Sequence, residues 1–243
     1  MTHTEWPRRV AALVQFPVED PASPVLERAD DHHLRKVLRA RVGEEVVVTD
    51  GRGRWSLCRV AEHELTRVSD VYLDEPAPST TLYLAGLKGD HANWAVAKAT
   101  EVGVSRIVPL VTSRSAVKFN AEASEKTLLR WRRITREAQG QCRRTYDVTI
   151  EEPMKVANVP DEVAVADLAG SGDWRGVRSV AVGPEGGWDE GEWDTTRRRV
   201  GLGPTVLRAE TAGVVAAALL AFQVGSWGLT LDIRVIGNDE GTR

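Results

Sequence analysis

The sequence predicts an α/β protein in two parts: a small, mostly β barrel and a larger domain in which strands and helices alternate. Residues 1–76 contain short segments of alternating apolar and polar residues, separated by turns rich in glycine, proline and aspartate. A proline-rich linker, residues 76–81, follows them. Beyond it, apolar strands alternate with helical stretches, which is typical of a mostly parallel sheet covered on both faces.

The composition is that of a globular protein and limits the possible functions. The chain has 243 residues, of which 42% are hydrophobic and 28% charged. Its net charge of −3 gives no general attraction to nucleic acid, so RNA binding requires a local basic patch. Cys58 and Cys142 form neither a metal quartet nor a disulfide framework, and they indicate a reduced, cytoplasmic setting. The N-terminus does not resemble a signal peptide.

The first part contains four expected strands and one inserted helix. The strands are expected at residues 10–16, 45–49, 55–60 and 68–73. Between the first two, apolar residues recur at helical spacing: Leu34, Val37, Leu38 and Val42. His32 and His33 have no third ligand at workable spacing, so we expect no metal site. The basic residues of this segment either follow RNA phosphates or form an ordinary solvated face: Arg35, Lys36, Arg39 and Arg41.

The second part contains alternating elements. Strands are expected at residues 82–87, 105–110, near 148, 163–168 and 177–182, and helices at 90–102 and 123–139. Residues 212–229 approach the length of a membrane span, but alanine and glycine dominate them and Gln223 and Ser226 interrupt them. We therefore expect a buried helix there and no membrane association.

Two glycine-containing turns follow consecutive strands near the C-terminus. The strand at 177–182 ends at GPEGG, residues 183–187, where glycine allows the backbone to approach a ligand closely. Asp189 and Glu192 have the spacing of a capping pair and predict a helix start. A second short strand ends at Leu202, and Arg208, Glu210 and Thr211 then begin an apolar helix. The pair of turns predicts the rim of a binding pocket, although two tight connections without a ligand would give the same pattern.

A strongly basic segment lies in the middle of the chain. Between Lys126 and Arg144 the only acidic residue is Glu137, and Trp131 offers a stacking surface among the arginines. Leu129, Arg132, Arg133 and Arg136 share one helical face. Arginine side chains bind phosphate oxygens well, so the segment favours RNA contact over a merely solvated face.

These motifs resemble those of the SPOUT-superfamily RNA methyltransferases of the RsmE family. The resemblance rests on GPEGG, on LGPTVLRAETA at 202–212, and on upstream matches that include Lys88-Gly89, Glu101-Val-Gly103, Arg114-Ser115 and Arg130-Trp131. His33, Leu34, Val37, Leu38, Arg39 and Gly43 match the pattern of the family's N-terminal PUA-like domain. The chain differs from the family at residues 143–147, where a different loop and one arginine are expected.

The resemblance implies both the fold and the activity. It implies a PUA-like RNA-binding barrel at 1–76 and a SPOUT methyltransferase domain at 77–243, whose last helix threads a preceding loop as a trefoil knot. The activity implied is methyl transfer from S-adenosylmethionine to N3 of a uridine in 16S ribosomal RNA, free or in the small subunit. The implied protein is a cytoplasmic homodimer that needs no metal.

The residues carried over by the resemblance fall into three sets. The expected catalytic residues are Arg208, which would stabilise the uridine anion, and Glu210 as base, with Glu185 as the alternative base. The expected cofactor-binding residues are Leu168, Val182, Gly183, Pro184, Glu185, Gly186, Gly187, Leu202, Gly203, Val206, Leu207 and Thr211. The expected RNA-binding residues are Arg9, Arg39, Lys88, Lys98, Arg114, Arg132, Arg136 and Arg144.

Three other interpretations remain open from the sequence. A catalytically silent RNA-binding protein would keep the basic segment without using the pocket, and a SPOUT enzyme acting on transfer RNA would share the pocket motifs. Residues 165–173 partly resemble the glycine-rich turn of Rossmann enzymes. The glycine count is wrong for that motif, so we expect a surface loop there.

Overall fold

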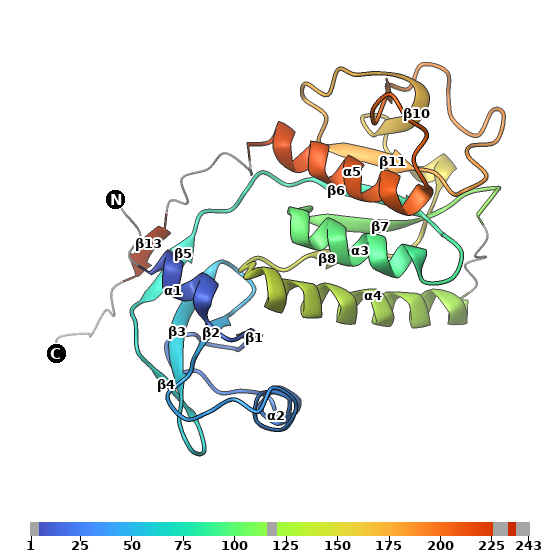
Figure 1. The fold of residues 1–243 in the computed structure, drawn as a ribbon. Coiled ribbons are helices and arrows are strands. Elements are labelled where there is room, and N and C mark those ends of the chain that lie inside the picture. Colours follow the sequence, from blue (N-terminus) through green and yellow to red (C-terminus); the bar gives the residue numbers. More distant parts are fainter. Residues whose placement is uncertain (1–4, 116–120, 226–232, 237–243) are drawn as a thin grey trace. The chain divides into compact units, whose positions relative to one another are not determined.

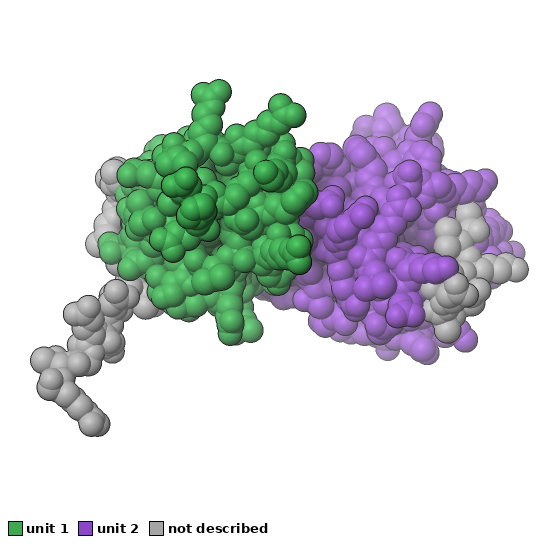
Figure 2. Space-filling model, turned by 90° about the horizontal axis from the view of Figure 1, so that it is seen from below, with its two compact units in different colours: residues 1–76, 139–147, 230–243 green, residues 77–138, 148–229 purple. Residues whose placement is uncertain are grey.

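The computed structural model describes residues 5–115, 121–225 and 233–236 and divides the chain into two compact units. The first unit comprises residues 1–76, 139–147 and 230–243, and the second comprises residues 77–138 and 148–229 (Figure 2). The chain therefore leaves the first unit after Pro76 and returns to it twice.

The first unit is built on a six-stranded mixed sheet with the order β1-β2-β3-β5-β13, with β4 paired to β3. Its strands are β1 (Gln15–Pro17), β2 (Glu45–Thr49), β3 (Arg54–Val60), β4 (Leu65–Arg67), β5 (Val71–Asp74) and β13 (Ile233–Ile236). Alternate residues of β2 enter two different hydrophobic clusters: Val46 and Val48 one, and Val47 the other. The strand expected at 10–16 is wrong in its first half, because α1 (Trp6–Ala11) begins with Pro7 in its first turn.

The inserted helix exists, but its register is not that of an α-helix. After α2 (Arg28–His32) the chain forms a π-helix at His33–Val37, closed by a hydrogen bond from Leu38 N to His33 O. Because an i→i+5 turn shifts the side-chain positions, the expected apolar face does not form. Leu34 is buried, whereas Val37, Leu38 and Val42 are exposed.

The second unit confirms the parallel α/β sheet. Its strand order is β12-β10-β11-β6-β7-β8, with β9 paired to β7, and every pair is parallel. The strands are β6 (Thr81–Ala85), β7 (Arg106–Val111), β8 (Thr149–Ile150), β9 (Met154–Lys155), β10 (Ala164–Ser171), β11 (Ser179–Val182) and β12 (Arg199–Val200). In the sheet, β7 and β8 lie on one side of β6, and β10, β11 and β12 lie on the other. The loops after β6 and β11 therefore flank a point where the strand order reverses, the usual ligand site of such sheets.

Among the described residues of the second unit, three α-helices pack on the same side of the sheet. These are α3 (His91–Val102), α4 (Ala121–Cys142) and α5 (Ala209–Gln223) (Figure 1). They share a core cluster with Leu82, Leu84, Val180 and Val182. The other face, which includes Tyr83 and Ala181, is covered by Val156, Val159, Trp188 and Trp193 from non-helical segments and a 3₁₀ turn.

Two sequence expectations for the C-terminal half are corrected. Asp189 and Glu192 do form the expected hydrogen bond, from Asp189 N to Glu192 Oε2 at 3.0 Å, but turns follow in place of a helix. Gly191 has φ +75° there, and Trp193 is drawn into the core. The expected helix at 212–229 is α5, which starts at Ala209 and ends before Gly225 with φ +77°; residues 226–229 lie outside the described residues. Among described residues, no helix combines the length and hydropathy needed to cross a membrane.

Candidate active site

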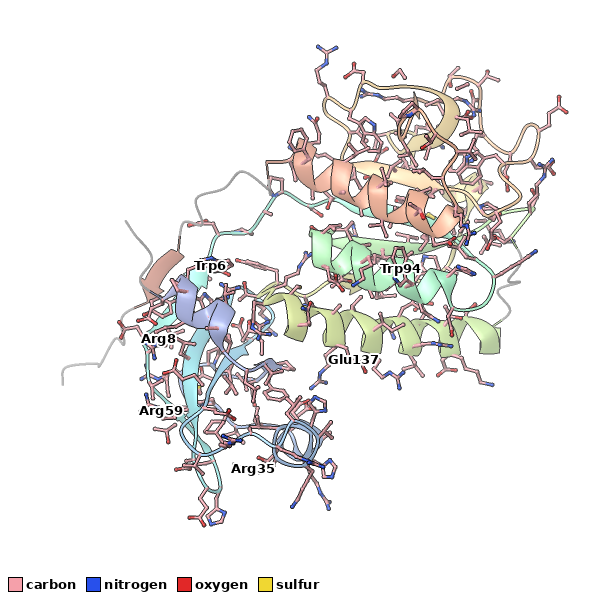
Figure 3. The ribbon with its side chains drawn as sticks, viewed as in Figure 1. Trp6, Arg8, Arg35, Arg59, Trp94 and Glu137 are labelled. Atoms are coloured by element: carbon pink, nitrogen blue, oxygen red, sulfur yellow. The ribbon has the colours of Figure 1, made fainter. Side chains whose placement is uncertain are left out.

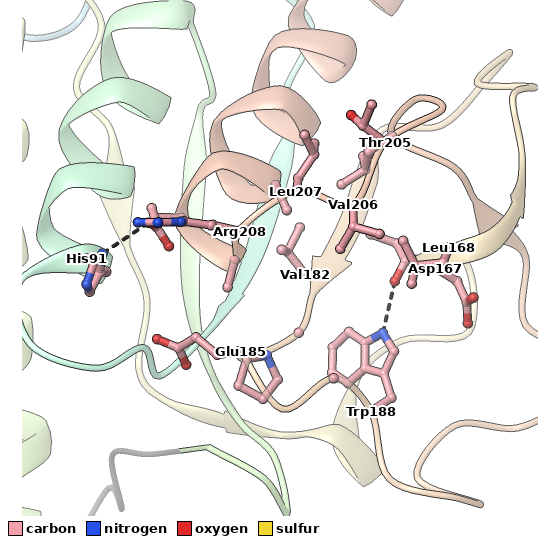
Figure 4. Close-up of a pocket in the computed structure, with 18 of the residues that line it drawn as sticks. His91, Asp167, Leu168, Val182, Glu185, Trp188, Thr205, Val206, Leu207 and Arg208 are labelled. Atoms are coloured by element: carbon pink, nitrogen blue, oxygen red, sulfur yellow. Dashed lines mark hydrogen bonds and ion pairs between the residues drawn. The ribbon is translucent and has the colours of Figure 1, made fainter.

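A cavity of about 710 Å³ lies at the carboxyl ends of β6, β10, β11 and β12, entirely within the second unit (Figure 4). Such a volume suits a cofactor-sized molecule. It is lined by Lys88, His91, Ala166, Asp167, Leu168, Val182, Gly183, Pro184, Glu185, Gly187, Trp188, Leu202, Gly203, Thr205, Val206, Leu207, Arg208, Ala209, Glu210 and Ala212. The two glycine turns expected to form a pocket rim therefore do meet at one cavity.

Most of the expected cofactor residues lie on this cavity. Only Gly186 and Thr211 of that set do not line it. No sequence motif assigned His91, Asp167 or Trp188 to the cavity, because their positions depend on how the loops after β6, β10 and β11 converge. No motif spacing encodes such a convergence.

The backbone of the turns is set by glycine and by Trp188. Gly187 and Gly203 have φ +68° and +132°, conformations that other residues rarely adopt. A Cβ on Gly183 would lie 3.1 Å from the Trp188 ring, whose Nε1 donates to Ala166 O at 2.9 Å (Figure 4). The turn at 183–187 therefore packs against the Trp188 indole, which is hydrogen-bonded to β10.

The wall of the cavity is apolar and open. Leu168 is 79% exposed and Val206 81% exposed, although both are large hydrophobic side chains. Exposed apolar side chains gathered at a concave site indicate a ligand-binding surface. Apolar side chains next to backbone N–H and C=O groups of two turns suit a planar nucleoside with a polar edge, so the residues present fit S-adenosylmethionine.

The charged side chains at the cavity differ in their contacts. Glu185 Oε1 accepts a hydrogen bond from Lys88 N at 2.9 Å, which ties the loop after β6 to the turn after β11. His91 Nδ1 lies 3.1 Å from Glu210 Oε1. Arg208 is exposed and has no ion-pair partner among the described residues, so the alternative in which Arg208 pairs with Glu210 is not what the structure shows.

The turn after β7 holds the GPEGG turn in place. Arg114 donates to Gly186 O at 3.1 Å and to Asp189 Oδ1 at 2.8 Å. Ser113 N donates to Glu192 Oε1 at 2.7 Å. The hydrogen bond from Arg114 holds the pKa of the Asp189 carboxyl below its usual value. Arg114, expected to contact RNA, is thus already engaged in supporting the GPEGG turn.

Arg9 and Trp131 require corrections. Arg9 is only 3% exposed, donates to Asp74 at 2.8 Å and lies over the Trp55 ring, so its guanidinium does not reach an RNA. Trp131 is 1% exposed and belongs to the core, so it offers no stacking surface. Both were expected to contact RNA because sequence alone does not separate a buried arginine or tryptophan from an exposed one.

The other basic residues have varied surroundings. Lys98 pairs with Glu101 at 2.8 Å, the surface-pair geometry, and Arg144 donates to Tyr146 O at 2.8 Å, its pKa lowered by burial. Arg35, labelled in Figure 3, donates to Asp31 and to two loop carbonyls. Those exposed to solvent are Arg39, Lys88, Arg132 and Arg136.

Among described residues, no group of three or more histidine, cysteine or carboxylate side chains is placed to hold a metal ion.

Comparison with known proteins identifies the family. Residues 74–221 match the model of an RNA methyltransferase domain, and residues 26–65 match that of an RNA methyltransferase PUA domain. The ribosomal RNA small subunit methyltransferase E of Mycobacterium tuberculosis is 30% identical over 85% of this chain and 88% of its own length. That of Bacillus subtilis is 25% identical over 87% and 94%.

A solved structure of a protein from the same family is also similar to this chain. The ribosomal RNA small subunit methyltransferase E of Neisseria gonorrhoeae, bound to S-adenosyl methionine, superposes with a TM-score of 0.68 at 25% identity, covering 86% of this chain and 97% of that one.

Fold and pocket thus define an RNA methyltransferase with a PUA domain. Within that class, the chain belongs to the ribosomal RNA small subunit methyltransferase E family.

Proposed function

We propose that this protein transfers the methyl group of S-adenosylmethionine to N3 of a uridine in small-subunit ribosomal RNA. The observation that carries the proposal is the cavity at which the turns 183–187 and 202–207 meet, with Arg208 and Glu210 at its edge. Membership in the methyltransferase E family supports the RNA substrate.

In this proposal, some cavity residues bind the cofactor and others take part in the methyl transfer. The two turns would hold the adenosine through backbone groups, and Leu168 and Val206 would cover its apolar faces. S-adenosylmethionine supplies an electrophilic methyl group on a cationic sulfur. Glu210 would remove the N3 proton, and Arg208, a cation without a partner among described residues, would stabilise the negative charge on a uracil carbonyl oxygen. Positioning the two reactants supplies much of the remaining acceleration.

Glu210 is a better candidate for the base than Glu185. The Glu210 side chain is 13% exposed and lines the cavity. Glu185, in contrast, is exposed and accepts a hydrogen bond from the backbone N–H of Lys88. A carboxylate that fixes a loop is already committed to a structural hydrogen bond.

Two surfaces support RNA binding. The exposed face of α4 carries Arg132, Arg133 and Arg136, and Glu137 on the same exposed side pairs with Arg133 at 3.5 Å (Figure 3). In the first unit, Arg39 is exposed beside the π-helix. We assign phosphate contacts to Arg39, Lys88, Arg132 and Arg136.

The finer features of the family are part of the same proposal. We infer a homodimer, a cytoplasmic location, a PUA-like RNA-binding domain at 1–76 and a SPOUT domain at 77–243. We also infer that α5 threads a preceding loop as a trefoil knot, an arrangement that is otherwise very rare. The family membership and the placement of α5 beside the cavity support these inferences.

Primer extension on 16S ribosomal RNA tests the function. An N3-methyl group blocks Watson–Crick pairing, so reverse transcriptase should stop at one uridine in RNA from the parent strain. The stop should vanish on deletion of the gene and return with the wild-type gene but not with Arg208→Ala. An unchanged stop in the deletion strain would refute the proposal, and a stop lost from transfer RNA alone would favour the transfer-RNA enzyme. Absence of S-adenosylmethionine binding by calorimetry would favour the silent RNA-binding protein.

A further inference from the structure

The proposed function leaves one question about the cavity open: where the proton removed from the uridine goes. His91 is the first residue of α3 and Glu210 the second residue of α5, and the two side chains meet at 3.1 Å. Their helices approach closely because Gly213 of α5 faces Ala95 of α3, where an added Cβ would lie 3.6 Å from the Ala95 Cβ. The pair is therefore held by two packed helices and not by flexible loops.

The two side chains differ in their access to solvent. Glu210 is 13% exposed, whereas His91 is 49% exposed. His91 lies at the cavity with its Nδ1 facing the Glu210 carboxylate (Figure 4). Its Nε2 has no hydrogen-bond partner among the described residues. Since the two ring nitrogens of histidine can act separately, the imidazole connects a nearly buried carboxylate to water.

The other charged groups around the pair do not offer this route. Lys88 and Arg208 carry donors but no acceptor, and Glu185 is held by Lys88 N. Asp90, next to His91, pairs with Arg130 of α4 at 2.7 Å. Asp167 pairs with Arg199 on the β10 side of the cavity. Imidazole is the one group among these that both accepts and releases a proton near neutral pH.

We propose, on the basis of the function proposed above, that His91 is the proton acceptor for Glu210 and returns the proton to solvent. Glu210 takes the N3 proton of the uridine, and the nitrogen lone pair forms the new N–C bond as the S–C bond breaks and its electrons stay on sulfur. Protonated Glu210 then gives its proton to His91 Nδ1, and the imidazolium releases a proton from Nε2 to water. The products are N3-methyluridine, S-adenosylhomocysteine and one proton.

This role predicts a pH dependence that a structural histidine would not have. His91 accepts a proton only when its ring is neutral, so the single-turnover rate of the wild-type protein should fall as the pH is lowered. A glutamine at position 91 can still form a hydrogen bond with Glu210 but carries no proton onward.

The test compares single-turnover methylation by wild type, His91→Gln and His91→Ala at several pH values, with calorimetric binding of S-adenosylmethionine measured alongside. His63→Gln, an exposed histidine of the first unit, is the matched control and should leave all values unchanged. His91→Gln should lower the rate by at least about tenfold and lose the acid-side fall, with cofactor affinity unchanged. Added imidazole should restore much of the rate of His91→Ala, because the site is open to solvent.

Other results would overturn the inference. A His91→Gln variant with the wild-type rate and pH profile would show that His91 carries no proton. A rate loss matched by lost cofactor affinity, or one that imidazole does not restore in His91→Ala, would make His91 a contact or a support for Glu210. A wild-type protein that forms no N3-methyluridine would instead refute the proposed function, so the two failures are distinguishable.

Discussion

Gly170 lies where β10 and β12 approach most closely. A Cβ at this position would lie 2.3 Å from Val200 C and 2.6 Å from Gly201 N, both of them backbone atoms. The β10–β12 pairing shifts register between Ala166 and Ser171, so the chain bulges around this point. β12 ends at Val200, at this close contact, and the second turn of the cavity follows directly.

Gly170→Ala should lower the free energy of unfolding by about 1–3 kcal/mol, because backbone atoms cannot move aside as a flexible side chain does. Urea unfolding measures the stability, and calorimetry should show weaker S-adenosylmethionine binding. Gly172→Ala is the control, since no atom lies within 4 Å of its added Cβ. Equal stability of the two variants would contradict the argument.

Arg208 is the residue whose surroundings most favour a role in chemistry. It is exposed at the cavity and directly precedes α5, and its side chain has no hydrogen-bond or ion-pair partner among the described residues. A structural arginine usually has a partner, as Arg9 has in Asp74.

Arg208→Ala should abolish methylation and leave S-adenosylmethionine binding nearly unchanged, because the charge acts on the uridine anion. Loss of one preorganised donor to a developing anion typically costs about 100-fold or more in rate. The assays are N3-methyluridine formation and calorimetry, with Arg175→Ala, an exposed arginine paired with Asp173, as control. A matching loss of cofactor affinity would reassign Arg208 to cofactor binding.

Among the secondary-structure elements, the turn after β7 supports the glycine-rich turn at 183–187, which is not followed by a helix. The hydrogen bonds of Ser113 and Arg114 to Glu192, Gly186 and Asp189 replace the support that a helix would give. The local sequence pattern predicts the capping pair of Asp189 and Glu192. It does not predict the contact of Glu192 with Ser113, because Ser113 is 79 residues away.

Arg114→Ala should weaken S-adenosylmethionine binding about two- to fivefold, a small effect because the contacts are exposed. Since the folded-state pKa of Asp189 is lowered, its ion pair with Arg114 is complete above the unfolded pKa, near pH 4, and is lost only as the pH falls through the folded value. Binding assays at pH 7 therefore report the intact pair. Arg178→Ala is the control, because Arg178 is exposed, directly precedes β11 and does not line the cavity. Unchanged cofactor affinity with weakened RNA binding would restore Arg114 to the RNA-binding set.

At the scale of the whole molecule, the segment 139–147 shows how distant parts of the sequence share one unit. The buried Asp74 carboxylate accepts hydrogen bonds from Arg9 at 2.8 Å, Trp55 at 2.9 Å and Thr145 at 2.6 Å. Tyr146 donates to Asp74 O at 2.8 Å. These bonds join α1, β3, β5 and the segment after α4, where the sequence departs from the family pattern.

Asp74→Ala should lower the stability of the first unit by about 3–5 kcal/mol, because Arg9 is left charged and buried without a counterion. Hydrogen exchange should show lost protection in β3 and residues 139–147. Replacing both residues, as Arg9→Leu with Asp74→Leu, should cost less than Asp74→Ala. Asp70→Ala, exposed between β4 and β5, is the control and should stay within about 0.5 kcal/mol of wild type. If Asp74→Ala were as stable as the double variant, the unpaired charge of Arg9 would not be the main cause of the lost stability.

The parts of this protein that depend on local chemistry can be predicted from the amino-acid sequence. Strands such as β2 and β6, the helix α3, the parallel arrangement and the two glycine turns follow from periodicity and from backbone freedom at glycine. The family followed from motifs at those turns.

Which side chains meet, and which are buried, depends instead on how the folded elements pack. His91 and Glu210 are 119 residues apart in the sequence and touch because α3 and α5 pack together. Arg9 and Trp131 have the residue types of an RNA contact and lie in cores. Burial and long-range pairing are set by how elements pack, and packing depends on residues far apart in the chain, so a local pattern does not carry that information.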